Sequence, residues 1–195
     1  MTWVARFLAT VVMAGLLASC AAVSLRSSWK DPTVTPRPYT RILVVGVAKD
    51  EGVRRLFEEI FVSELKRRGV DAIPSFSHFP ITEPIDREKI VTAVQLTRAT
   101  AVIATKVSRV ETIQDYGPQP VAPWDFTGNY YAGVGNPPVA VTFTEATLET
   151  KLFDAETGRM VWVANTSTFD GNQAVTVSVE LSQVIVEKLR KDGFI

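Results

Sequence analysis

The chain has 195 residues, of which 46% are hydrophobic, and its 21 Lys and Arg residues balance 21 Asp and Glu residues. This composition excludes an intrinsically disordered chain, and the length suits one domain with a proper core. Because the net charge is zero and no phosphate-neutralising cluster of Lys and Arg is present, nucleic acid is not an expected partner. The single cysteine excludes an internal disulfide.

The first residues have the order of a secretory signal peptide. Arg6 supplies a weak positive charge, residues 7–17 are apolar, and small residues follow. The apolar run is shorter than the roughly 20 residues that a transmembrane helix needs. We therefore expect a signal peptide that is removed during export.

The four residues from Leu17 to Cys20 (LASC) resemble the lipobox of bacterial lipoproteins. The resemblance implies that residues 1–19 are a lipoprotein signal peptide, cleaved before Cys20, and that a lipid is attached to the Cys20 thiol. Each methylene of that lipid that is buried in the bilayer contributes about 0.8 kcal/mol to membrane binding. In such lipoproteins an Asp directly after the cysteine retains the protein at the inner membrane. This chain has Ala21 there, so the resemblance implies a protein anchored to the outer membrane and facing the periplasm. The alternative is an ordinary signal peptide in which Cys20 is a small apolar residue.

Residues 20–39 contain three prolines and scattered polar residues, which is typical of a linker. We expect the lipidated cysteine and a tether here, followed by an α/β domain at 40–195. Trp29 is expected to dock the tether back onto that domain, and the alternative is a role in binding a ligand.

The first half of the domain alternates strands and helices. Residues 41–47 are a β-branched apolar run, which predicts a buried strand. Residues 53–65 have apolar side chains at steps of three and four, which predicts a helix, and 70–74 resemble a second strand. The charged side chains between the apolar positions of this helix are expected on its solvated face: Arg54, Arg55, Glu58, Glu59, Glu64, Lys66 and Arg67.

Asp86 can cap a second helix over residues 87–97, and residues 101–112 then resemble a strand. Residues 139–154 alternate strongly between apolar and polar side chains, which predicts a strand, and residues 159–169 alternate in the same way.

Residues 155–158 between these two strands carry a hairpin turn signal, after which 159–169 predict a strand and 174–191 a helix. The order predicts an α/β fold: a single domain whose mixed β-sheet has two β-α crossovers, followed by an antiparallel meander and a C-terminal helix.

The element order and the hairpin from Phe153 to Ala164 look like small periplasmic lipoproteins of uncharacterised families. More distantly, the order resembles the amino-terminal domain of the TolB translocation protein and the domain of curli-secretion and penicillin-binding-protein-activator lipoproteins. Those proteins act by binding other envelope components. The resemblance implies a binding role but transfers no residues, because none of their binding motifs matches.

A catalytic set is not evident in the sequence. The turn at 46–52 joins a strand to a helix but lacks the glycine spacing of nucleotide-binding loops, so Asp50 and Glu51 are expected to cap the helix. His78 is the only histidine and is expected on a surface loop. We therefore expect no enzyme, no catalytic or metal-binding residues and no cofactor.

Residues 115–138 form a loop that is far longer than a hairpin needs, and such loops are usually functional or disordered. The partner-binding candidates are its aromatic residues: Tyr116, Trp124, Phe126, Tyr130 and Tyr131. The favoured partner is another envelope protein, with a homo-oligomer also open. The alternatives are a glycan or small-ligand module that uses these rings as stacking platforms, and a simple connector.

Overall fold

The structure is a computed structural model, and it describes residues 22–79, 86–117, 139–169 and 173–195. The elements within these ranges are β1 (Val23–Lys30), β2 (Arg41–Val47), α2 (Glu51–Arg67), β3 (Asp71–Pro74), the 3-10 helix η1 (Ser75–Ser77), α3 (Arg87–Thr97), β4 (Ala101–Gly117), β5 (Val139–Asp154), β6 (Met160–Phe169) and α5 (Ala174–Asp192).

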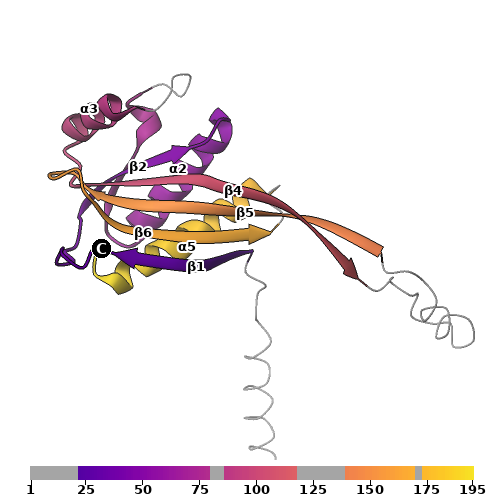
Figure 1. Cartoon of the computed structure of the whole chain (residues 1–195). Coiled ribbons are helices and arrows are strands. Elements are labelled where there is room, and N and C mark those ends of the chain that lie inside the picture. Colours follow the sequence, from indigo (N-terminus) through magenta and orange to yellow (C-terminus); the bar gives the residue numbers. More distant parts are fainter. Residues whose placement is uncertain (1–21, 80–85, 118–138, 170–172) are drawn as a thin grey trace, which may run out of the picture.

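Six strands form one mixed sheet in the order β1-β6-β5-β4-β2-β3 (Figure 1). β2 runs parallel to both of its neighbours, β3 and β4, which is why helical crossovers link these strands. The pairs β4–β5, β5–β6 and β6–β1 are antiparallel. This arrangement confirms the predicted fold class, a single α/β domain with two crossovers, a meander and a C-terminal helix.

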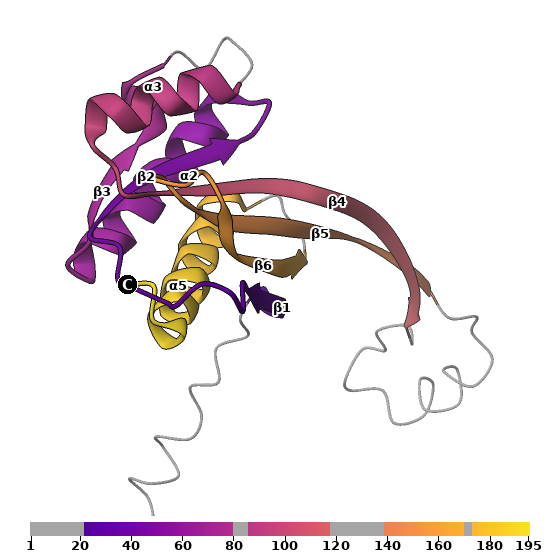
Figure 2. The same cartoon turned by 60° about the vertical axis from the view of Figure 1, so that its left-hand side comes forward.

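Helices cover both faces of the sheet. Figure 2 shows α5 on one side of the sheet and α3 on the other. The larger core lies on the side of α2 and α5, where Phe61 and Ile185 pack against the sheet residues Ile42 and Trp162. A smaller core lies under α3 and includes Ala93 together with sheet residues such as Leu43 and Val102.

Two aspartates begin the helices as the sequence predicted. Asp50 accepts a hydrogen bond from the backbone N–H of Val53 at 2.8 Å, and Asp86 accepts one from Lys89 at 2.8 Å. Each carboxylate satisfies a backbone donor that the first turn of a helix leaves without a partner. The turn before α2 is therefore a capped helix start.

The expected tether at 20–39 is wrong for residues 23–30. Residues 23–30 form β1, which pairs antiparallel with β6 from Val23 opposite Thr168 to Lys30 opposite Trp162. Its apolar residues Val23, Leu25 and Trp29 stand at alternate positions, but only Val23 is buried. The domain therefore includes residues 23–30 and does not start at residue 40. Trp29 is part of this edge strand, and its side chain is 46% exposed.

Candidate functional site

β4 and β5 continue beyond the rest of the sheet as a two-stranded arm (Figures 1 and 2). β2 ends opposite Lys106 of β4, and β6 pairs with β5 only from Glu145 onward. Within the described residues, 107–117 therefore pair only with β5 and 139–144 only with β4, and we call these two segments the arm. Each segment of the arm has an outer edge whose backbone N–H and C=O groups have no strand partner in the described ranges.

The arm changes the boundaries expected for the long loop at 115–138. Tyr116 lies within β4, opposite Ala140 of β5, so the connection outside the described residues is 118–138. The sequence of this part of β4 is polar and alternates weakly, and its pairing with a strand more than twenty residues away leaves no local signal. Trp124, Phe126, Tyr130 and Tyr131 lie outside the described residues, as does Cys20.

The base of the arm carries exposed apolar side chains. Val107 is 52% exposed and Val110 is 62% exposed. A β-bulge between Val107 and Arg109 shifts the register, so Val107 pairs with Leu148 and Val110 with Ala146. Leu148 packs against the larger core, and Ala146 is two residues away on the same face of β5. Both valines therefore lie on the face of the sheet that α2 and α5 cover in the body of the domain.

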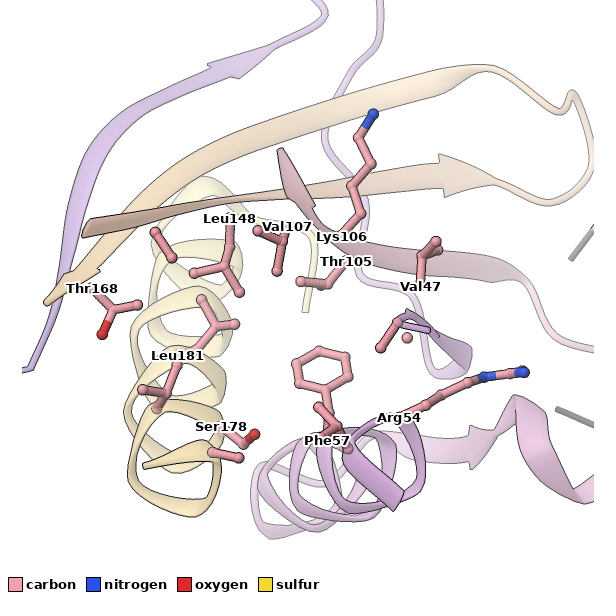
Figure 3. Close-up of a pocket in the computed structure, with 16 residues that line it drawn as sticks. Val47, Arg54, Phe57, Thr105, Lys106, Val107, Leu148, Thr168, Ser178 and Leu181 are labelled. Carbon is pink, nitrogen blue, oxygen red and sulfur yellow. The ribbon is translucent and has the colours of Figure 1, made fainter. Parts of the chain in front are cut away.

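A mainly apolar cavity of about 150 Å³ opens where the arm leaves the body (Figure 3). Its walls come from the end of β2, the first turns of α2 and α5, and the strands β4, β5 and β6. Phe57, Leu148 and Leu181 surround it, while the charged end of Arg54 points away from it. Sequence reasoning missed this cavity because it is assembled from six separate elements.

The cavity lies next to a buried ion pair of two residues that were expected on a solvated face of α2. Arg54 and Glu58 are 1% and 0% exposed, and Arg54 Nε donates to Glu58 Oε1 at 2.9 Å. The same oxygen accepts hydrogen bonds from Ser75 Oγ at 2.7 Å and from the backbone N–H of Gly46 at 2.9 Å. The expectation was wrong because η1 covers this side of α2. The pair fixes the end of β2 and the start of η1 relative to the helix.

A second polar cluster closes the opposite end of the domain. Asp154 Oδ2 accepts hydrogen bonds from Arg37 at 2.8 Å and from the Tyr39 hydroxyl at 2.9 Å, and Oδ1 accepts one from the backbone of Thr157 at 2.9 Å. Burial alone would raise the pKa of Asp154, but these hydrogen bonds outweigh it and hold the pKa well below its usual range. Asp154 therefore ties residues 37–39 to the predicted turn at 155–158.

The only histidine and the acidic residues were also weighed in the sequence as candidate site residues. His78 is exposed at the end of η1, which confirms its predicted surface position. Among the described residues, no three His, Cys, Asp or Glu side chains come together as a metal site. None of the helices in the described ranges combines the length and apolar composition needed to cross a membrane.

No protein-family model matches this sequence, and a search of curated proteins found no match. Several solved structures are distantly similar. A PelC dodecamer from Paraburkholderia phytofirmans is 13% identical, with 86% of this chain and 96% of that chain covered and a TM-score of 0.48. Lipoprotein GNA1162 from Neisseria meningitidis is 14% identical, with 77% and 97% covered and a TM-score of 0.41. A likeness at this level assigns neither a family nor a function.

Proposed function

We propose that this chain is a lipid-anchored envelope protein that binds another envelope protein through the arm and catalyses no reaction. The observation that carries the proposal is the pair of outer edges on the arm, at 107–117 and 139–144. An extended segment of a partner can add to such an edge as a further strand, so that main-chain hydrogen bonds supply affinity and alternate side chains supply specificity.

The lipid on Cys20 would hold the protein at the outer membrane, facing the periplasm. The lipobox-like sequence LASC supports this part of the proposal. Membrane attachment limits the search for a partner to one surface, which suits an assembly or transport factor.

A binding role is favoured over catalysis because the buried carboxylates already have structural partners. Glu58 accepts hydrogen bonds from Arg54, Ser75 and two backbone N–H groups. Asp154 is held by Arg37 and by its own turn. Each of these carboxylates connects elements of the fold, which is a sufficient reason for its burial.

The aromatic residues at the far end of the arm and in the connection after it are the proposed side-chain part of the contact. Tyr116 belongs to β4 and the other four candidates follow it in the connection between the two strands of the arm: Trp124, Phe126, Tyr130 and Tyr131. Aromatic side chains are enriched among the residues that dominate protein interfaces. A glycan that stacks on these rings is the alternative ligand.

The test of partner binding is photo-crosslinking in the living bacterium. A crosslinking residue replaces Thr112 or Thr144, which are exposed and lie opposite each other on the arm. The matched control replaces Gln95, an exposed residue of α3. We expect a discrete protein adduct from the arm positions alone. Adducts to glycan would favour the alternative, and arm positions that behave like Gln95 would overturn the proposal.

The test of the anchor is metabolic labelling with palmitate. We expect label in the full chain and none in Cys20→Ala. Label that persists in the variant would contradict attachment at Cys20, and absence of label from the unmodified chain would contradict the lipid anchor itself.

A further inference from the structure

One end of the domain gathers exposed apolar side chains. At this end β2 and β6 finish, α2 and α5 begin, and β4 leaves the body of the sheet. Of the nine large apolar side chains that are exposed among the described residues, six belong to these parts or to the start of β1: Leu25, Val47, Val53, Val107, Val110 and Val175. We call them the apolar end. Three of them, Val47, Val53 and Val107, also line the cavity of Figure 3.

Cys20 is three residues before the start of β1, and β1 starts at this same end of the domain. β1 begins at Val23, whose partner in the sheet is Thr168 near the end of β6. The backbone N–H of Val23 also donates to Glu180 of α5 at 2.9 Å, which fixes the start of β1 beside that helix. Three residues span at most about 11 Å, so a lipid on Cys20 enters the bilayer close to the apolar end.

We propose that the apolar end rests in the interfacial layer of the bilayer that holds the Cys20 lipid. This inference rests on the lipid anchor of the proposed function. Apolar side chains on a surface next to a bilayer are stabilised when they enter the boundary between headgroups and acyl chains. The anchor alone would leave the domain free to rotate, whereas the apolar end gives it one orientation. The arm then leaves the domain near the membrane surface, so its partner is a membrane-associated protein.

The charges beside the apolar end are compatible with shallow contact. Lys49 at the start of α2 and Lys106 and Arg109 of β4 are exposed, and their long side chains can keep the charge at the level of the headgroups. The acidic groups of Asp50, Glu51 and Glu111 are exposed as well and stay in water. The contact therefore involves the side chains of the apolar end and not the insertion of a whole element.

The test uses the full lipidated protein in vesicles of phosphatidylethanolamine and phosphatidylglycerol. Cys20 is the only cysteine and carries the lipid, so Val110→Cys or Val175→Cys supplies one thiol for an environment-sensitive fluorophore. Leu96→Cys, at an exposed apolar residue of α3, is the matched control. We expect bromine-labelled acyl chains to quench the probe at residues 110 and 175 but not at residue 96.

A charge variant sharpens the test without weakening the fold. Val53→Glu and Val175→Glu introduce acidic residues in the first turns of α2 and α5, where the helix dipole favours them. Together they should lower the ratio of docked to undocked protein at least tenfold, measured with the probe at residue 110. The matched pair on α3, Val91→Glu with Leu96→Glu, should leave this ratio unchanged.

Each outcome decides the inference. Palmitate labelling with no quenching at residues 110 and 175 would overturn the membrane contact while the anchor stands. A probe that is shielded from water but is not quenched would show a protein, such as a second copy, on this surface, and would also overturn it. Failure of palmitate labelling would instead contradict the proposed function on which the inference rests.

Discussion

Arg54 and Glu58 form an ion pair inside the protein, with Nε and Oε1 2.9 Å apart and both side chains almost wholly buried. Removing one partner of a buried pair leaves an uncompensated charge, which typically costs about 3–5 kcal/mol. We therefore expect Glu58→Gln to lower the free energy of unfolding by about 3 kcal/mol, measured by urea denaturation. Glu59→Gln, at the exposed neighbouring position, should change it by less than about 0.5 kcal/mol. Equal effects of the two substitutions would contradict the buried pair.

Asp154 should make the stability of the domain depend on acid pH. Its hydrogen bonds from Arg37, Tyr39 and Thr157 favour the charged carboxylate, so Asp154→Asn should lower the free energy of unfolding near pH 7 by about 1.5–3 kcal/mol. The measurement is urea denaturation of both proteins across a pH series.

The sign of this dependence follows from the lowered pKa of Asp154 in the folded state. Its contribution is fully present above the ordinary pKa of 3.8 and is lost as the pH falls through the lower folded value. The difference between the protein and Asp154→Asn should therefore stay constant from about pH 7 to pH 5 and shrink below about pH 4. A difference that grew toward low pH would contradict this assignment.

The sequence predicted those elements whose side chains keep a clear periodicity. The apolar run at 41–47 and the capped helix at 87–97 have the predicted bounds, and the strand at 139–154 does too. β1 was missed because the three prolines that follow it and its scattered polar residues favoured a linker, although Val23, Leu25 and Trp29 stand at alternate positions. The long-range pairing with β6 that makes it a strand cannot be seen in eight residues.

The candidate site was less predictable because its features depend on packing between distant segments. An Arg and a Glu one helical turn apart have the same spacing on an exposed face as in a core, and only the position of η1 buries Arg54 and Glu58. The arm likewise depends on where β2 and β6 stop, which no pattern within β4 or β5 reveals.

Gly46 is required where β2 passes α2 closely. A Cβ atom at this position would lie 2.9 Å from Cδ1 of Phe57, a ring that is itself packed in the core. Overpacking of this kind typically costs about 1–3 kcal/mol, so we expect Gly46→Ala to lower the free energy of unfolding by about that amount.

The cause of this cost is tested by a double-mutant cycle with Phe57→Leu, which removes the ring that the new methyl group meets. In that background Gly46→Ala should cost at least about 0.5 kcal/mol less, because contacting residues do not act independently. Gly52→Ala is the control, since its Cβ would meet only Oδ1 of Asp50, at 3.2 Å, and alanine favours the first turn of α2. If Gly46→Ala were as well tolerated as Gly52→Ala, the close approach of β2 to Phe57 would be refuted.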